Sequence, residues 1–500
     1  MAGRLVGVGR VASDPELGAR DLFDFLGGGH LKKRHGKKTH TLFFLETLVL
    51  QKKKILHDAR FELNELAASR FSKERKMKSV IFLTFLVATC SAVSTCDPGN
   101  TFGHPLRSQF LLAANYTNLN HGSYGAVPSS VLQAKEAWLV HIEANSDMWF
   151  RYEMFHVLDT LEKTAATFLN ADHKSIVFVR NASNGLNAVL RSLLNGVSGF
   201  AKKKVLILSE AYQMVKNCLA FLEMEFSQQV VTVNVTYPYD ETALLNSVES
   251  VFASNPAGTF GFASFSHIVS VPGIILPAKK LVQICKQYGV LAMIDGAHVP
   301  GQIALDLTDI GAHIYIGNLH KWMYTPKGSA ILYVSEDTQS MIYPSVISEE
   351  GQGPSRFKIG FRYEGTDDVT SYMAFPAALQ FVTSLGGPTA VMAYTHCLAV
   401  QGGQILSTAW NTTTMTTEAN MGAMVDVMLP QPQNGTLIST LPTRLLQGEA
   451  SNGLVTYVPM YSVPYNGQAT WFARVSGQVY NDLTDYQRLA EAVVELLGKP

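Results

Sequence analysis

Ile-Asp-Gly-Ala-His at residues 294–298 ends one apolar run, and Asn-Leu-His-Lys-Trp at 318–322 ends the next. Each run has the length and the unbroken apolar character of a buried strand in a parallel sheet. Open α/β sheets bind ligands beyond the carboxyl ends of their strands. We therefore expect Asp295 and Lys321 to share one crevice.

An aspartate and a lysine in one crevice are the pair that pyridoxal phosphate chemistry requires. The lysine amine forms a Schiff base with the cofactor aldehyde, and the carboxylate keeps a proton on the pyridine nitrogen. Desolvation favours the neutral, nucleophilic amine, and apolar neighbours such as Leu319 and Met323 predict an enclosed Lys321. Taken alone, the two residues would more simply be a surface lysine and a helix-capping aspartate.

Seven short segments match, in order, the motifs of one family. They are Leu-Asn-His-Gly-Ser-Tyr-Gly (119–125), Arg-Asn-Ala-Ser-Asn-Gly-Leu-Asn (180–187), Ser-His-Ile-Val-Ser (266–270), Asp-Gly-Ala-His (295–298), Asn-Leu-His-Lys-Trp (318–322), Glu-Gly-Thr-Asp-Asp (364–368) and Arg-Val-Ser-Gly-Gln-Val-Tyr-Asn (474–481). From about Leu119 to Tyr480 the chain resembles the class V aminotransferases, pyridoxal-phosphate enzymes of fold type I. It is most similar to the branch that holds isopenicillin N epimerase-like proteins and L-cysteine desulfhydrases.

The resemblance implies an α/β fold, with a mostly parallel seven-stranded sheet in a large domain and a small C-terminal α+β domain. The residue pattern agrees, because short apolar runs alternate with helical periodicity. Predicted strands cover 176–179, 205–208, 230–235, 260–265, 290–294, 314–316 and 330–334, with further strand-like segments at 454–459 and 470–475. Predicted helices include 130–169, interrupted near 145–147, and 184–194, 212–225 and 484–497. We place an N-terminal arm and the large cofactor-binding domain at 97–385, and the small domain at 386–500.

The N-terminal region has a different character. Residues 1–76 carry 16 Lys and Arg against 9 Asp and Glu, without sustained periodicity, in a chain of zero net charge. We expect a disordered extension or sequence upstream of the true start; a basic tail that binds an acidic surface is the alternative. The mildly acidic remainder argues against a nucleic-acid partner.

Residues 77–96 resemble a secretory signal peptide. Met77-Lys78 precedes the apolar run 80–88, and small residues follow at 91–94. The run is too short for a stable membrane span. If translation starts at Met77, we expect a secreted or lumenal protein; a buried segment in a cytoplasmic protein is the alternative.

Cysteines and glycosylation triplets add little to the choice between a secreted and a cytoplasmic protein. Cys218, Cys285 and Cys397 lie in apolar, helix-like surroundings and are interpreted as buried thiols, and no framework of paired cysteines is visible. Asn-X-Ser/Thr triplets begin at Asn115, Asn181, Asn234, Asn411 and Asn434. They favour a secreted glycoprotein only weakly.

The cofactor phosphate needs hydrogen-bond donors at a helix start. The turn before the helix at 184–194 provides them through Ser183 and the backbone amide of Asn184. The resemblance further implies that His298 reaches the cofactor ring oxygen and that Asn318 and His320 contact the cofactor. It also implies that Thr366 reaches the phosphate of a neighbouring subunit, and hence a homodimer. We identify no metal site.

For the substrate, Arg474 is the candidate anchor of an α-carboxylate, because guanidinium binds carboxylates in a bidentate fork. Asn120, His121 and Ser123 are predicted to line the substrate entrance. Many family members place a histidine over the cofactor ring. The matching segment here, 209–213, has none, so Tyr212 is only a candidate ring or substrate contact.

These residues predict an enzyme that removes the Cα proton of an amino acid through Lys321. β-Elimination, epimerisation and transamination all begin with that step. The desulfhydrase-like pattern favours elimination at a C–S bond of cysteine, a thioether or a sulfoxide; an epimerase or an aminotransferase is the alternative. Cys397 is the only cysteine after Lys321 and lies in a helical stretch, so we do not expect sulfur transfer to a carrier. A non-catalytic binding protein with the same fold is a further alternative, which the retained Asp295 and Lys321 oppose.

Overall fold

The computed structural model describes Cys96 and residues 101–194, 199–200, 202–227, 229–348, 356–431 and 434–498. These residues belong to one compact unit. The predicted N-terminal extension and signal peptide lie outside the described residues, except for Cys96. Among the described helices, none is both long and apolar enough to cross a bilayer.

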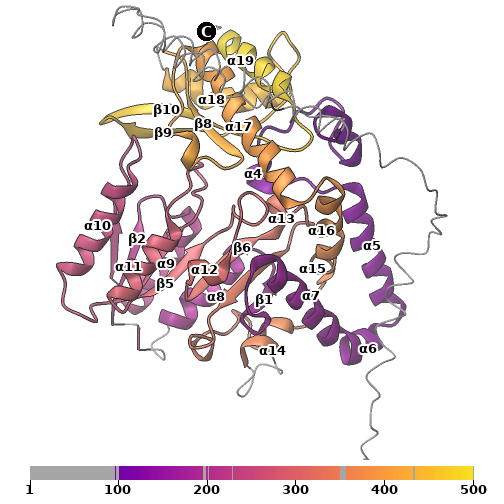
Figure 1. Cartoon of the computed structure of the whole chain (residues 1–500), viewed down its shortest axis with the longest axis vertical. Helices are drawn as coiled ribbons and strands as arrows, with labels where there is room; N and C mark the ends of the chain where they lie inside the picture. Colours follow the sequence, from indigo (N-terminus) through magenta and orange to yellow (C-terminus); the bar gives the residue numbers. More distant parts are fainter. Residues whose placement is uncertain are drawn as a thin grey trace, which may run out of the picture. The chain divides into compact units, whose positions relative to one another are not determined.

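A seven-stranded sheet forms the centre of the large domain (Figure 1). Its strands are β1 (Ile176–Val179), β2 (Lys204–Leu208), β3 (Val230–Val233), β4 (Phe260–Ser266), β5 (Leu291–Asp295), β6 (Ile314–Asn318) and β7 (Ala330–Val334). In the order β1-β7-β6-β5-β4-β2-β3, only β7 runs antiparallel to its neighbours. The predicted α/β fold with a mostly parallel seven-stranded sheet is confirmed.

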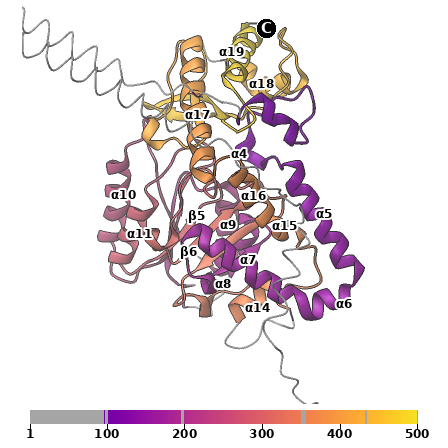
Figure 2. The same cartoon turned by 45° about the vertical axis from the view of Figure 1, so that its right-hand side comes forward.

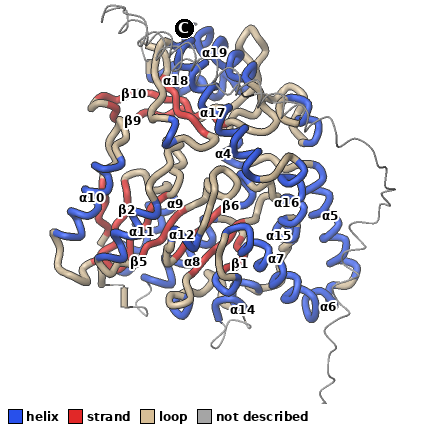
Figure 3. The backbone as a smooth tube through the Cα atoms, in the orientation of Figure 1, coloured by secondary structure: helices blue, strands red, loops and turns tan. Residues whose placement is uncertain are grey.

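Helices cover both faces of this sheet (Figure 3). Alternate residues of a strand point to opposite faces, so Val177 and Val179 of β1 join one apolar cluster while Phe178 joins the other. One cluster includes α8 (Ala182–Leu194), α9 (Gln213–Phe226) and α14 (Arg356–Arg362). The other includes α7 (Met154–Leu169), α10 (Glu241–Ala253), α11 (Ala278–Gln287) and α16 (Phe375–Ser384). Burial on both sides explains why the strands are continuous apolar runs.

The helix predicted at 130–169 is interrupted where expected. α5 (Ser129–Ala144) ends before Asn145, whose side chain caps α6 (Ser146–Met148), and a π-helical turn (Trp149–Glu153) leads into α7. α5 packs along α15 (Thr370–Met373) and α16 (Figure 2).

A three-stranded antiparallel sheet follows the large one in sequence. It consists of β8 (Met424–Met428), β9 (Met460–Tyr465) and β10 (Gln468–Ser476), with β10 in the centre, and α17 (Pro388–Trp410), α18 (Gly435–Gln447) and α19 (Leu483–Gly498) pack beside it. The strand predicted at 454–459 is wrong. Every second residue of the segment is buried, namely Leu454, Thr456 and Val458, but the segment makes only one isolated β-bridge. The alternating pattern therefore belongs to an extended connection that does not pair along its length with another strand.

Cys397 is not the buried thiol that the sequence predicted. It forms a disulfide with Cys96, 301 residues earlier in the chain, whereas Cys218 and Cys285 are buried free thiols. Sequence alone could not pair the two positions, because their proximity depends on how α17 packs against the N-terminal arm.

We expect reduction of this disulfide to lower the free energy of unfolding by roughly 2–5 kcal/mol, because the open chain gains conformational freedom when unfolded. Denaturant midpoints with and without dithiothreitol measure the loss. A Cys397→Ser variant should unfold at the reduced midpoint in both conditions. Equal midpoints for the oxidised and reduced wild type would contradict the disulfide.

Candidate active site

β5 and β6 deliver Asp295 and Lys321 to one cavity, as the sequence predicted. β5 ends at Asp295, and β6 ends at Asn318, directly before the short helix α13 (Leu319–Trp322). Both side chains line an inner cavity of about 300 Å³. Its lining also includes Ser183, Tyr212, His298, Asn318 and His320.

Lys321 is enclosed and has an altered acidity. Its Nζ lies 2.8 Å from Nε2 of His298. Burial, helped by the positive charge of Arg474, lowers the pKa of Lys321 to about 7, although Asp295 acts in the opposite direction. In a large share of the molecules, the Lys321 side chain is therefore a neutral amine near neutral pH. This is the form that attacks an aldehyde.

Asp295 and His298 are both buried beside this amine. Burial raises the pKa of Asp295, while a hydrogen bond from the backbone amide of Ala297 (3.0 Å) and the charge of Lys321 oppose the rise. Burial lowers the pKa of His298 well below its usual range, and Lys321 adds to this effect. The His298 Nδ1 atom is buried and has no hydrogen-bond partner among the described residues. A buried polar atom of this kind needs a partner, which a bound ligand would supply.

The N-terminus of α8 forms another wall of the inner cavity. Asn181, Ala182 and Ser183 line it, and the Ala182 amide donates to Oδ1 of Asn318 (2.9 Å), which pins the helix start to the end of β6. Asn184 does not line the cavity; its amide donates to Oδ1 of Asn181 (2.9 Å). A helix start favours anions through its free amides and its dipole.

Arg474 lies on β10, in a second and larger cavity of about 1050 Å³. The two cavities share Ser123, Ser270 and Lys327, so they adjoin. The guanidinium is buried and donates to the Ser270 carbonyl (2.5 Å), to Oδ1 of Asn120 (2.7 Å) and to Oγ of Ser123 (2.8 Å). Its Nε atom has no partner among the described residues.

Asp426 is a buried carboxylate near Arg474 that sequence reasoning missed. It sits opposite Arg474 in the β8–β10 pairing and accepts hydrogen bonds from the Tyr461 hydroxyl (2.6 Å) and the Gly273 amide (2.7 Å). Burial raises the pKa of Asp426 to about 6, which these hydrogen bonds and Arg474 oppose.

Besides Asn184, two predicted site residues line neither cavity. His121 is fully buried and lines neither cavity, so its prediction as a substrate-entrance residue is wrong; it packs inside the protein and bonds to Tyr480 and to the backbone of Lys321. Asn120 does line the larger cavity. Thr366 is exposed and does not line the inner cavity of its own chain.

Lys327 was also missed. It lines both cavities, its Nζ donates to the Gly125 carbonyl (3.0 Å), and burial lowers its pKa. In the sequence, the only indication that Lys327 belongs to the site is its position six residues after Lys321, and it lies outside the motifs.

Pyridoxal phosphate fits these residues. Lys321 offers the amine, Asp295 the carboxylate for the pyridine nitrogen, and Ser183 at the start of α8 offers a donor for the phosphate. The unpartnered Nδ1 of His298 marks a place for a further polar atom.

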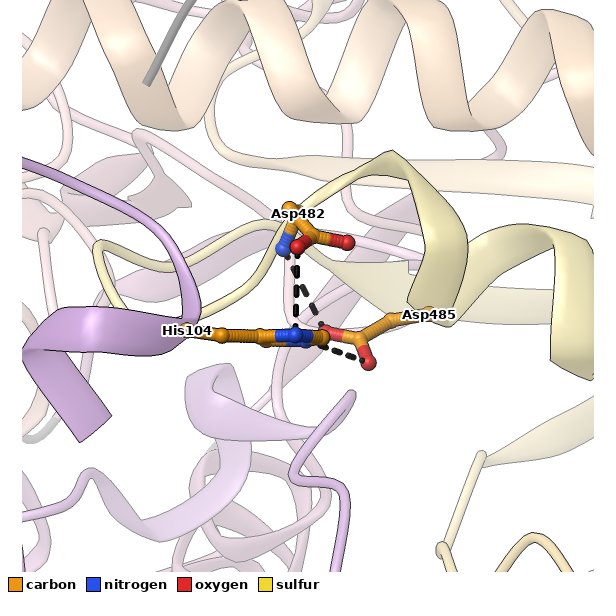
Figure 4. A group of neighbouring side chains, drawn as sticks. All are labelled: His104, Asp482 and Asp485. Carbon is orange, nitrogen blue, oxygen red and sulfur yellow. Dashed lines mark hydrogen bonds and ion pairs between the residues drawn. The ribbon is translucent and has the colours of Figure 1, made fainter. Parts of the chain in front are cut away.

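A separate polar group lies away from both cavities. Nδ1 of His104 is 3.1 Å from Asp482, and its Nε2 is 3.1 Å from Asp485 (Figure 4). Each ring nitrogen faces a different carboxylate, the geometry of a protonated histidine that bridges two acids rather than of three ligands around a metal. The hydrogen bond to Asp485 raises the pKa of His104, against the effect of burial.

The His104 bridge should stabilise the fold at acidic pH. Because the pKa is raised on folding, the stabilisation is complete below the unfolded pKa of about 6.5 and is lost as pH rises through the folded value. His104 is half exposed, so we expect less than about 1 kcal/mol. Unfolding midpoints of wild type and His104→Gln should differ at pH 5.5 and converge at pH 8.5; a pH-independent difference would contradict the bridge.

Known proteins resemble this chain over most of its length. The family model for aminotransferase class-V matches residues 123–489. An L-cysteine desulfhydrase of Arabidopsis thaliana is 28% identical over 417 residues, which cover 76% of this chain and 87% of the relative. A hercynylcysteine sulfoxide lyase of Schizosaccharomyces pombe is 25% identical, over 79% of this chain and 97% of the relative. A solved structure of a cysteine desulfurase from Thermococcus onnurineus NA1 superposes with a TM-score of 0.64 at 16% identity, over 80% of this chain and 99% of that one, which shows a shared fold.

Proposed function

Because the chain belongs to the class V aminotransferase family of pyridoxal-phosphate-dependent enzymes, we propose that it cleaves a C–S bond of an amino acid by β-elimination. The substrate class is cysteine or a related thioether or sulfoxide. The observation that carries the proposal is the shared inner cavity of Lys321 and Asp295. Relatives that are named L-cysteine desulfhydrase and hercynylcysteine sulfoxide lyase support the choice of bond.

The chain's own residues supply binding and proton transfer. Pyridoxal phosphate, when bound, provides an electron sink for charge that develops at the substrate Cα. Arg474 binds the substrate α-carboxylate at the junction of the two cavities. Lys321, with its pKa of about 7, accepts the Cα proton near neutral pH. Asp295, buried in the inner cavity, would hold the proton of the pyridine nitrogen.

In this proposal the Cα–H and Cβ–S bonds break, and the sulfur leaves as sulfide from cysteine, as a thiol from a thioether or as a sulfenic acid from a sulfoxide. Pyruvate and ammonia follow after hydrolysis. Cys397, the only cysteine after Lys321, is held in the disulfide. It therefore offers no thiol for a persulfide, and we expect the sulfur to leave the protein directly.

Product analysis tests the reaction. The purified protein, loaded with pyridoxal phosphate, is incubated with cysteine, cystathionine and a cysteine sulfoxide, without added keto acid. We expect pyruvate and ammonia in equal amounts, with sulfide from cysteine. Racemised or transaminated substrate without pyruvate would overturn the elimination and identify an epimerase or an aminotransferase.

Replacement of Arg474 should separate binding from chemistry. Arg474→Lys keeps the charge but loses the planar fork, so we expect the KM for cysteine to rise about 10- to 100-fold, the range for a hydrogen bond to a charged group. The absorption of the bound cofactor should be unchanged. Steady-state kinetics measure the effect, and an unchanged KM would remove Arg474 from the substrate site.

We also propose a homodimer in which Thr366 contacts the phosphate in the partner's site. Its exposure and its absence from the inner cavity of its own chain support this arrangement. Exposed Leu139, Val140, Met148 and Tyr152, on and beyond α5, add apolar surface for a subunit contact. Sedimentation equilibrium should give twice the chain mass, and Thr366→Ala should weaken cofactor binding; a monomer with full cofactor affinity would contradict the proposal.

Finally, we propose that the protein enters the secretory pathway as a glycoprotein. The Cys96–Cys397 disulfide supports an oxidising compartment. Asn115, Asn234, Asn411 and Asn434 are exposed, whereas Asn181 lines the inner cavity. Sequencing of the mature N-terminus should find a start near residues 93–96, so that Cys96 is retained, and peptide-N-glycosidase should reduce the mass. An intact Met1 without glycans would contradict this proposal.

A further inference from the structure

Three of the sequence motifs meet at the backbone carbonyl of Lys321. His121 belongs to the motif at 119–125, Tyr480 to the motif at 474–481, and Lys321 to the motif at 318–322. Nε2 of His121 lies 2.8 Å from the backbone carbonyl of Lys321, and its Nδ1 lies 2.8 Å from the Tyr480 hydroxyl. Nδ2 of Asn118 ends this series of hydrogen bonds and lies 2.8 Å from the same hydroxyl.

The carbonyl of Lys321 needs this partner. α13 ends at Trp322, one residue later, so the helix offers no amide one turn ahead to receive the carbonyl. Tyr324, with φ of 58°, turns the chain away. A buried carbonyl without a donor is costly, and the His121 ring supplies the donor from a different part of the chain.

The donor and the acceptor in each of these hydrogen bonds follow from the chemistry of the groups. A carbonyl only accepts, so Nε2 of His121 must donate to it. Burial lowers the pKa of His121 to about 3, so the ring is neutral and its Nδ1 accepts from the Tyr480 hydroxyl. The Tyr480 oxygen accepts from the amide nitrogen of Asn118, whose Oδ1 is occupied by the Asn120 amide (3.1 Å).

The backbone near His121 also packs closely against the backbone carbonyls of His320 and Lys321. Gly125 has φ of 71°, and a Cβ there would lie 2.1 Å from the carbonyl oxygen of His320 and 3.0 Å from that of Lys321. Only glycine allows the turn to approach so closely. Lys327 then donates to the Gly125 carbonyl. The turn at 121–125 is thus packed against the peptide units that carry Lys321.

We propose that His121, oriented by Tyr480, is a positioning residue that fixes the peptide carbonyl of Lys321 and thereby the direction in which the Lys321 side chain enters the cavity. The proposal rests on Lys321 as the cofactor-binding lysine, but not on the sulfur substrate. His121 makes no contact with either cavity. Its effect therefore passes through the backbone.

Capture of the cofactor by the apoprotein tests this role without turnover. Tyr480→Phe deletes the hydroxyl and leaves Nδ1 of His121 without its donor. Tyr324→Phe is the matched control, because Tyr324 is also fully buried and packs against the His121 ring, but its hydroxyl donates to Gln478 instead. Stopped-flow absorbance follows the reaction of pyridoxal phosphate with each apoprotein as a function of pH.

We expect Tyr480→Phe to slow capture by roughly three- to tenfold, the equivalent of one hydrogen bond, and Tyr324→Phe to stay within about twofold of wild type. Equal slowing in both variants, or none in Tyr480→Phe, would overturn the proposal and assign the network to stability alone. A Lys321→Ala apoprotein that still captures cofactor covalently would instead refute the role of Lys321, which distinguishes the two failures.

A measurement on the wild type covers the case in which Tyr480→Phe does not fold. In protein labelled with ¹⁵N-histidine, with the His121 signal assigned by its loss in a His121→Gln sample, the ring should carry its proton on Nε2 between pH 5 and pH 8. A proton on Nδ1, or titration in that range, would contradict the assigned hydrogen bonds.

Discussion

Lys321→Ala should bind pyridoxal phosphate only reversibly and should be colourless after dialysis. Without the Lys321 amine, the proposed covalent attachment and the proton acceptor at the substrate Cα are both lost. We expect elimination to fall by at least about 10³-fold, within the range that a positioned acid or base contributes. Absorbance after dialysis measures attachment, and pyruvate release measures turnover.

Lys327 is the competing amine, because it lines the same cavity and burial lowers its pKa as well. Borohydride reduction of the loaded wild type, followed by peptide mass spectrometry, should find the label on Lys321. A label on Lys327, or colour that survives dialysis of Lys321→Ala, would refute the proposed attachment.

Asp295→Asn should produce the second large loss. The amide preserves size but carries no negative charge, so it cannot hold a proton on the pyridine nitrogen. We expect kcat to fall about 10²- to 10³-fold, as when one preorganised electrostatic contact is removed, while the cofactor stays attached to Lys321. Steady-state kinetics together with the cofactor spectrum separate the two effects. An unchanged kcat would show that Asp295 does not contact the ring.

The strands and the chemistry could be predicted from sequence because both depend on local pattern. Continuous apolar runs mark strands that are buried on both faces, and the residues that end β5 and β6 must lie at the same edge of a parallel sheet. Asp295 and Lys321 were therefore expected together, and they line one cavity.

The parts that could not be predicted depend on exact helix starts or on distant contacts. α8 begins at Ala182, two residues before the predicted start, and each helical residue turns by about 100°, so Asn184 points away from the cavity that Asn181 and Ser183 line. The motif at 119–125 predicts that His121 lies near the substrate entrance, but a motif does not give the direction of its side chain. Its partners are 200 and 359 residues away in sequence, and no local pattern records such contacts.

The link between Cys96 and Cys397 closes a ring of peptide that contains the whole seven-stranded sheet as well as Asp295 and Lys321. A protease that cuts the backbone once at an exposed loop inside this ring cannot separate the two fragments. On a gel run without reductant the nicked protein would migrate close to the intact chain, and it would divide into two bands only after the thiols are freed.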